Sequence, residues 1–359
     1  MTLQEIVTEL QSMGARIEVP VQDRGRRGGA GPTDGKPFLI GDVAITVPTL
    51  GAFAEQSPYA VVEDDDGYQL TKNGQKLLSV QFPPTPRFYD LSTKDGIPYR
   101  QIALMHGRDT LATTVFQKCI RWRRPGERCQ FCAIEQSLNS GSTVIVKTPD
   151  QLAEVAEAAV RLDGASHFVM TTGTINSRDK GVHYLARCSQ AVKAAVDISI
   201  QAQFEPPEDL DDMLLLRDAG VESVGLHLES FDQSVRERIA PGKAKISIER
   251  YFETSVRAVQ IFGWNQVSTY IIAGLGDSPE SIVEGCRKFA MIGVYTFIVP
   301  LRPVIGTPLQ DAKTPEPETM LSIYTKVAAI NREYGLSWSR TKAGCVRCAA
   351  CSAIPVFER

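Results

Sequence analysis

Short apolar strands alternate with amphipathic helices through most of the chain. From about residue 110, β-branched runs are each followed by a longer segment with apolar residues at helical spacing. The predicted strands are TTVFQK, SHFVMTT, DISIQAQF, ESVGLHLE, QVSTYIIAG and YTFIVPL. The predicted helices span residues 149–162, 181–195, 208–219, 247–262 and 279–292. This alternation is typical of an α/β protein with a parallel sheet.

Capping signals support the starts of three of these helices. Thr148, Ser247 and Ser278 each place an oxygen acceptor ahead of the free amides of a first turn, and Pro follows the first and the last of them. Parallel strands with right-handed helical crossovers can close into a barrel or stay open. We expect a partial (β/α)6 barrel of the TIM type, in which the chemistry gathers at the carboxyl ends of the strands.

The first hundred residues have a different, mixed pattern. A first helix precedes the Gly/Arg-rich segment DRGRRGGAGPTDGK, and strand-like runs follow, with Asp-Gly and Asn-Gly pairs that mark turns. Glycines and arginines in that segment can wrap an anionic ligand or simply form a loop. We expect an N-terminal α+β domain over residues 1–104, the barrel over 105–335 and a C-terminal cluster-binding segment over 336–359.

Composition and charge narrow the function classes. Charged residues are 23% of the 359, hydrophobic residues are 43%, and the net charge is -3. These values give no general attraction to nucleic acid or to anionic membranes. The N-terminus shows no apolar stretch long enough for a signal peptide or a membrane span. We therefore expect a cytoplasmic protein without a membrane partner.

Six of the eight cysteines fall into two tight triplets. The triplets are Cys119, Cys129 and Cys132, and Cys345, Cys348 and Cys351. Such clustering favours metal binding over disulfides, because thiolates that share a metal centre must converge from one short segment. Cys188 and Cys286 lie in helical patterns, and we expect them to be packing residues.

The first triplet has C-x9-C-x2-C spacing and follows the first barrel strand. Three thiolates can hold three irons of a 4Fe–4S cluster and leave the fourth iron open to a cofactor. A structural zinc site completed by His106 is the alternative. The position of the triplet at the carboxyl end of a strand, where a barrel has its active site, favours the cluster.

On these residues the chain resembles the radical S-adenosylmethionine (SAM) superfamily. The usual motif there is C-x3-C-x2-C with an aromatic residue before the last Cys, a position that Phe131 fills, and the longer first spacing is a departure known in minority branches. The resemblance covers about residues 105–335 and is nearest to the biotin-synthase-like branch. The Gly/Arg segment and both triplets also resemble a radical SAM family often encoded near nitrilases.

The resemblance implies a reaction and a set of SAM contacts. It implies reductive cleavage of SAM to a 5′-deoxyadenosyl radical, which abstracts hydrogen from a small molecule. Relatives contact SAM through polar residues at the ends of the second to fourth strands, through a cation after the fourth strand and through a Gly-rich turn after the fifth. This chain has such residues at the same places. For the carboxylates, helix capping and salt bridges at the barrel rim are the alternatives. The implied SAM-binding residues are Thr172, Gly173, Gln203, Glu205, Glu229, Arg238 and Gly274. No residue is assigned as catalytic.

The second triplet has C-x2-C-x2-C spacing near the C-terminus. This equals the first three ligands of a bacterial ferredoxin motif, but Pro355 stands in place of the fourth Cys. We expect an auxiliary iron–sulfur cluster, of the 4Fe–4S type, with one open position. It can act as a sacrificial sulfur source, a Lewis-acid site for substrate or an electron relay; a structural zinc or a clip that closes the barrel is the alternative.

Sulfur insertion into a small, anionic metabolite is our first functional hypothesis, and cluster-assisted oxidation or rearrangement is the second. A non-catalytic iron–sulfur electron carrier is a rival from another class. The arginine-rich run RWRRPGER is expected to be a solvated loop, or else a docking surface for RNA or an acidic electron donor such as flavodoxin or ferredoxin. The negative net charge counts against RNA. His227 is expected to be a buried, hydrogen-bonded histidine.

Overall fold

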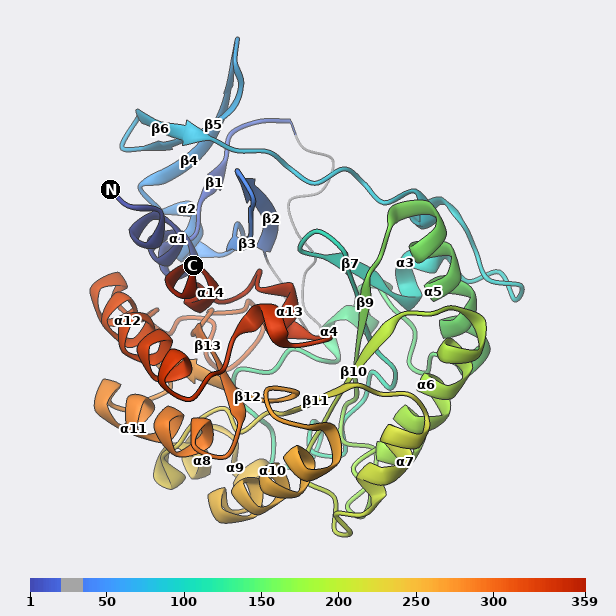
Figure 1. Ribbon diagram of the computed structural model, residues 1–359. Coiled ribbons are helices and arrows are strands. Elements are labelled where there is room, and N and C mark those ends of the chain that lie inside the picture. Colours follow the sequence, from blue (N-terminus) through green and yellow to red (C-terminus); the bar gives the residue numbers. More distant parts are fainter. Residues whose placement is uncertain (21–34) are drawn as a thin grey trace.

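Six parallel strands build the open barrel that the pattern predicts (Figure 1). The computed structural model describes residues 1–20 and 35–359. The barrel strands, in spatial order, are β8 (Thr110–Thr114), β9 (His167–Thr171), β10 (Ser199–Phe204), β11 (Ser223–Leu226), β12 (Val267–Ala273) and β13 (Val294–Pro300). A short antiparallel strand, β7 (Leu104–His106), extends the edge beside β8. Because β7 and β13 do not pair with each other, the barrel is partial, and the predicted fold class is confirmed.

Helices that connect the strands cover the outer face of this sheet (Figure 1). They are α5 (Pro149–Asp163), α6 (Val182–Ala195), α7 (Asp212–Asp218), α8 (Gln233–Ile239), α9 (Pro241–Ala244), α10 (Ile248–Phe262), α11 (Pro279–Ala290) and α12 (Pro317–Glu333). Short helices α3 (Tyr99–Ile102) and α4 (Gln136–Asn139) and the 3-10 turn η1 (Arg87–Asp90) lie outside this series. The three predicted caps are confirmed, because the side chains of Thr148, Ser247 and Ser278 each accept a bond from a first-turn amide.

Two predicted elements differ from the structure. The first barrel strand begins at Thr110 and ends at Thr114, ahead of the predicted run TTVFQK, whose later residues leave the sheet and form a bridge between Phe116 and Val146. Helix α7 begins at Asp212 instead of residue 208, because the carboxylate of Asp209 accepts the amide of Asp211 and forms a turn before the helix.

The N-terminal part forms two small sheets around a first helix. Helix α1 (Leu3–Met13) precedes β1 (Arg16–Ile17), which pairs with β4 (Tyr59–Asp64), β5 (Gly67–Lys72) and β6 (Gln75–Ser79) in one sheet. Strands β2 (Gly35–Ile40) and β3 (Val43–Pro48) form a hairpin, followed by α2 (Ala52–Glu55). The Asp-Gly and Asn-Gly pairs lie between β4 and β5 and between β5 and β6, as their turn chemistry predicts.

The C-terminal segment packs between the barrel and this N-terminal part. It contains the 3-10 turn η2 (Trp338–Arg340) and two short helices, α13 (Cys345–Cys348) and α14 (Ile354–Glu358). The carbonyl of Ala350 accepts the backbone amide of Thr46 at 2.6 Å and the side-chain amide of Gln11 at 3.2 Å. Strand β3 and helix α1 therefore hold the segment that carries the second cysteine triplet.

Two further observations concern the whole described chain. Among the described residues, no helix is both long enough and apolar enough to cross a bilayer. The Gly/Arg-rich segment that we predicted to wrap an anion falls mostly within residues 21–34, outside the described residues.

The cap of α5 gives a direct test of the fold. Thr148 and Gln151 form a reciprocal capping box, with bonds of 3.3 and 2.9 Å. Replacing Thr148 by Ala should lower the free energy of unfolding by about 1 kcal/mol, because a first-turn amide loses its acceptor. The measurement is the urea denaturation midpoint.

Thr325→Ala is the matched control for this cap. Thr325 is exposed within α12 and its hydroxyl bonds only to the carbonyl of Leu321 in its own helix. Since Ala has the higher helix propensity, this change should leave stability equal or slightly raised. Equal losses from the two substitutions would contradict the capping role.

Candidate functional site

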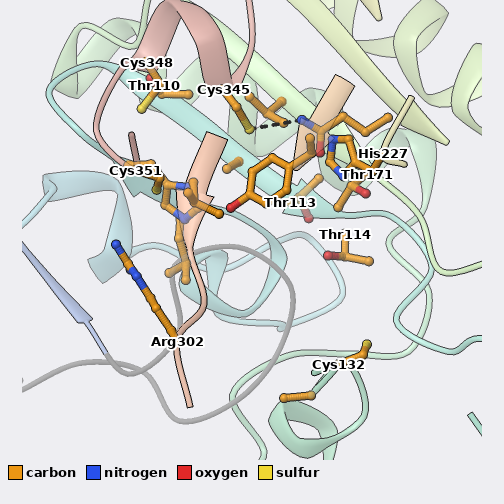
Figure 2. Close-up of a pocket in the computed structure, with 18 of the residues that line it drawn as sticks. Thr110, Thr113, Thr114, Cys132, Thr171, His227, Arg302, Cys345, Cys348 and Cys351 are labelled. Atoms are coloured by element: carbon orange, nitrogen blue, oxygen red, sulfur yellow. Dashed lines mark hydrogen bonds between the residues drawn. The ribbon is translucent and has the colours of Figure 1, made fainter. Parts of the chain in front are cut away.

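Alternating side chains of the barrel strands line one cavity of about 300 Å³ (Figure 2). Successive residues of a strand point to opposite faces, so residues two apart project into the interior together. Lining positions related in this way are Thr110, Ala112 and Thr114; Val169 and Thr171; His227 and Glu229; Tyr270 and Ile272; and Phe297 and Val299. The wall is therefore largely apolar, with a few polar groups aimed inward.

The two cysteine triplets reach opposite ends of this cavity. Figure 2 shows Cys132 at one end and Cys345, Cys348 and Cys351 at the other. Cys132 belongs to the loop that follows the carboxyl end of β8. The amide of Gly344, next to Cys345, donates to Nδ1 of His167 at the first residue of β9, so the second triplet lies at the amino ends of the strands.

The loop of the first triplet, residues 115–135, packs directly on the end of β9. The amide of Gly173 donates to the carbonyl of Phe116 at 3.0 Å. A Cβ at Gly173 would lie 2.1 Å from the carbonyl oxygen of Lys118, so a side chain would push the cysteine loop away. The predicted SAM contact Gly173 is thus a position where the backbone needs glycine, and neighbouring Thr172 bonds its hydroxyl to the Gly173 carbonyl at 2.8 Å.

Two buried ion pairs stand beside the first triplet. Lys243 Nζ lies 2.6 Å from Oε1 of Glu229, and Arg121 forms a pair with Glu205. Thr174 adds a hydroxyl bond of 3.0 Å to Glu205. Burial lowers the pKa of Lys243, but Glu229 and the other negative groups around it together outweigh burial and keep the pKa above its usual value.

The same reasoning holds for the carboxylate of the second pair. Burial raises the pKa of Glu205, but Arg121, Lys243 and the hydrogen bonds to the carboxylate together outweigh burial and leave that pKa below its ordinary value. Lys243 and Glu205 are therefore charged at neutral pH, and each faces an oppositely charged partner in a low-dielectric setting.

Sequence reasoning did not identify the two cations of these pairs. Arg121 was expected in a solvated loop, but it is 7% exposed because Glu205 draws it inward. Lys243 is 8% exposed, whereas Arg238, the cation chosen from the same run, is exposed and donates to the carbonyl of Leu275 at 3.2 Å. Helix α9 has only four residues, and Gly242 and Ala244 are buried as well, so no helical period in the sequence could single out Lys243.

The rest of the arginine-rich loop faces solvent. Arg123 is 76% exposed and Arg124 59%, although each approaches a glutamate. Arg128 stacks on Trp122, with its guanidinium carbon 3.8 Å from the ring centroid. The expectation of a solvated loop therefore holds for Arg123 and Arg124 and fails for Arg121, while Arg128 is half-buried and donates to the carbonyl of Cys132 at 3.4 Å.

The thiols of the first triplet suit a metal centre by their chemistry. Burial raises the pKa of Cys132 to about 12 and also raises that of Cys129, so neither ionises alone at neutral pH. A soft metal centre that displaces the proton supplies the positive charge that a buried thiolate requires. The residues present therefore fit an iron–sulfur group.

A single metal ion finds no comparable arrangement in the described residues. Across residues 1–20 and 35–359, no three His, Cys, Asp or Glu side chains converge closely enough to hold one ion. An iron–sulfur cluster sets a different requirement, because its thiolates bind separate irons.

A chain of hydrogen bonds supports Cys348 of the second triplet. The Gly344 amide can only donate, so Nδ1 of His167 accepts and Nε2 carries the proton. Nε2 lies 3.0 Å from the hydroxyl of Thr110, which leaves that hydroxyl free to donate to Cys348. Burial lowers the pKa of His167 to about 4, consistent with a neutral ring.

Three further predictions have clear outcomes. Cys188 and Cys286 are 0% and 1% exposed in the core, so their packing role is confirmed. His227 lines the cavity with its ring 5.0 Å from that of Tyr270, and within the described part of the chain it makes no hydrogen bond, contrary to our expectation. Gly274 takes φ +103° and packs closely on Leu301 and Pro315.

Comparison with known proteins finds similarity to one superfamily. Residues 122–289 match the model of the radical SAM superfamily. Bacteriochlorophyllide c C-7(1)-hydroxylase of Chlorobaculum limnaeum is 23% identical over 307 residues, which cover 79% of this chain and 76% of that protein. Biotin synthase of Persephonella marina (strain DSM 14350 / EX-H1) is 23% identical over 209 residues, 57% of this chain and 59% of that enzyme.

Among solved structures, a methylornithine synthase superposes with a TM-score of 0.49 at 16% identity, over 70% of this chain and 72% of that one.

The Lys243–Glu229 pair predicts a large and specific stability effect. Lys243→Met should lower the free energy of unfolding by about 3–5 kcal/mol, because it leaves the Glu229 carboxylate buried without a counter-charge. Urea denaturation of the metal-free protein measures this loss.

The exposed pair of Arg287 and Glu333 supplies the comparison. It has a distance of 2.8 Å, close to that of the buried pair, but its side chains are 41% and 53% exposed. Arg287→Met should cost about 0–1 kcal/mol. A loss at Lys243 as small as this one would show that Glu229 is not held as a buried anion.

Proposed function

We propose that the chain, whose residues 122–289 match the radical SAM superfamily, is a radical SAM enzyme that abstracts hydrogen from a small molecule held in the barrel cavity. In this proposal Cys119, Cys129 and Cys132 hold a 4Fe–4S cluster that binds SAM. When bound, the cluster supplies the electron that cleaves SAM and frees a 5′-deoxyadenosyl radical. The family match supports the radical chemistry, and the cavity supports a small substrate.

The observation that carries the proposal is the position of the cavity between the two cysteine triplets. A molecule inside it contacts Cys132 at one end and the second triplet at the other. A radical formed at the mouth can therefore reach a substrate that also touches the second site. A protein that only carries electrons has no need of a cavity between its two sites.

In this proposal, residues at the carboxyl ends of the barrel strands bind SAM. Of the predicted SAM-binding residues we keep Thr172, Gly173, Glu205, Glu229, Arg238 and Gly274, and we set Gln203 apart because its amide lies 3.1 Å from Sγ of Cys345. Of these, Glu205 and Glu229 already have buried cationic partners, so they offer neutralised carboxylates that accept hydrogen bonds without repelling the SAM carboxylate. The exposed Arg238 remains available to an anionic group.

The second triplet decides the reaction class. We propose that it holds an auxiliary iron–sulfur cluster and that sulfur insertion is the reaction, with oxidation or rearrangement as the alternative. The inward position of all three thiols supports direct contact between that cluster and substrate. The two relatives, by their names a synthase and a hydroxylase, do not decide between the reactions.

Electron supply completes the proposal. Arg123 and Arg124 lie exposed on the loop that carries the first triplet, so an acidic donor such as flavodoxin or ferredoxin can dock close to the cluster. We further propose that residues 1–104 brace the second site, residues 105–335 carry SAM and residues 336–359 carry the auxiliary cluster.

Iron counting and SAM cleavage test this function together. After anaerobic reconstitution with iron and sulfide, we expect about eight irons per chain, halved when either triplet is replaced by Ala. With SAM and dithionite, 5′-deoxyadenosine should form in the wild type. It should be lost when Cys119, Cys129 and Cys132 are removed, because the open iron is gone.

A double substitution of the packing cysteines is the control. Cys188 and Cys286 touch neither triplet's cavity, so Ala at both positions should leave the iron content unchanged. Zinc in either triplet would overturn that cluster. Full iron without 5′-deoxyadenosine would leave the electron carrier as the better account.

A further inference from the structure

Gln203 directs its side-chain amide at a cysteine of the second triplet. It projects from β10 into the barrel, and its Nε2 lies 3.1 Å from Sγ of Cys345, the contact drawn as a dashed line in Figure 2. The same nitrogen lies 2.7 Å from Oε1 of Gln201. Gln203 is 5% exposed, so water hardly competes. Both amide hydrogens therefore have protein acceptors.

The backbone fixes the orientation of this amide. The backbone amide of Cys345 can only donate, and it donates to Oε1 of Gln201 at 3.2 Å. Nε2 of Gln201 in turn donates to the hydroxyl of Ser268 at 3.3 Å. Because Gln201 presents oxygen on this side, Gln203 must present nitrogen, and its second hydrogen faces the sulfur of Cys345.

The packing around Gly344 holds Gln201 in place. Gly344 has φ +107°, and a Cβ there would lie 2.0 Å from the side-chain carbon Cδ of Gln201. The backbone before Cys345 thus lies directly against the glutamine that orients Gln203. Few other rotamers are open to either side chain.

The other two cysteines each have a polar neighbour from a different element. Cys348 is bonded by the hydroxyl of Thr110 on β8. The hydroxyl of Thr46 on β3 lies 3.8 Å from Sγ of Cys351. The Cys351 thiol donates to the Thr46 hydroxyl, whereas the Gln203 amide donates to Cys345 over the shorter distance of 3.1 Å.

We infer that Gln203 is a positioning residue of the second cysteine site, whose amide orients the Cys345 thiolate and makes a cluster bound there easier to reduce. This inference rests on the proposed auxiliary cluster. A donor aimed at a ligand sulfur stabilises the extra negative charge of the reduced state, which raises the reduction potential. Gln203, first considered as a SAM contact, is thereby reassigned to the opposite end of the cavity.

The test uses the full chain with Cys119, Cys129 and Cys132 replaced by Ala, so that only the second site can bind a cluster. In this background Gln203→Met removes the donor and keeps the length of the side chain. We expect the equilibrium constant for reduction to fall about tenfold, which is 59 mV for a one-electron couple. Potentiometric titration followed by electron paramagnetic resonance measures it.

Gln101→Met is the matched control. Gln101 lines the same cavity but donates to the carbonyl of Gly141 at 3.2 Å, away from the second triplet. This variant should keep the parent potential. An equal shift in both variants would overturn the inference, because it would reflect a general loss of cavity polarity.

A second readout needs no substitution at Gln203. In the parent background, electron–nuclear double resonance of the reduced cluster should show a nitrogen coupling that changes when glutamine is labelled with ¹⁵N. Absence of that coupling overturns the role of Gln203. Absence of iron from the background overturns the auxiliary cluster, and thus the proposed function, whereas iron with an unchanged potential in Gln203→Met overturns the inference alone.

Discussion

The two-residue period of the barrel strands is the constraint on which the rest of the structure depends. On β10 it turns Gln201 and Gln203 into the interior, and Glu205 continues the same face beyond the strand end. Strand β10 thus contributes one interior side chain near the amino end, one in the middle and one at the carboxyl end of the barrel. Because the side-chain period fixes these directions, a register shift of one residue would send all three to the helix-covered face.

Burial of charge shapes the carboxyl end. Two carboxylates there would be costly alone, and each is paired with a cation from the segments that wrap over the sheet, Arg121 before β9 and Lys243 after β11. These pairs tie the loop of the first triplet and helix α9 to the strand ends. The site is consequently held by charge pairing at one end and by neutral hydrogen bonds at the other.

Much of this arrangement could be predicted from the sequence. Strand and helix order, three caps and the grouping of cysteines followed from local patterns, which depend on short spacings. Contacts between residues far apart in the sequence could not be predicted in this way. Arg121 and Glu205 are 84 residues apart, and Gln203 and Cys345 are 142 apart. The resemblance placed Gln203 at the SAM-binding end of the cavity, but its amide contacts Cys345, because nothing local indicates that residue 345 returns to the amino ends of the strands.

The loop of the first triplet carries two kinds of arginine that respond differently to ionic strength. Arg121 lies buried against Glu205, where mobile ions cannot enter, so its interaction changes little with added salt. Arg123 and Arg124 are exposed, and dissolved ions screen their field over a distance of about 10 Å at 0.1 M. Raising the salt concentration therefore weakens the attraction of Arg123 and Arg124 for an acidic partner, while it leaves the buried pair of Arg121 and Glu205 intact.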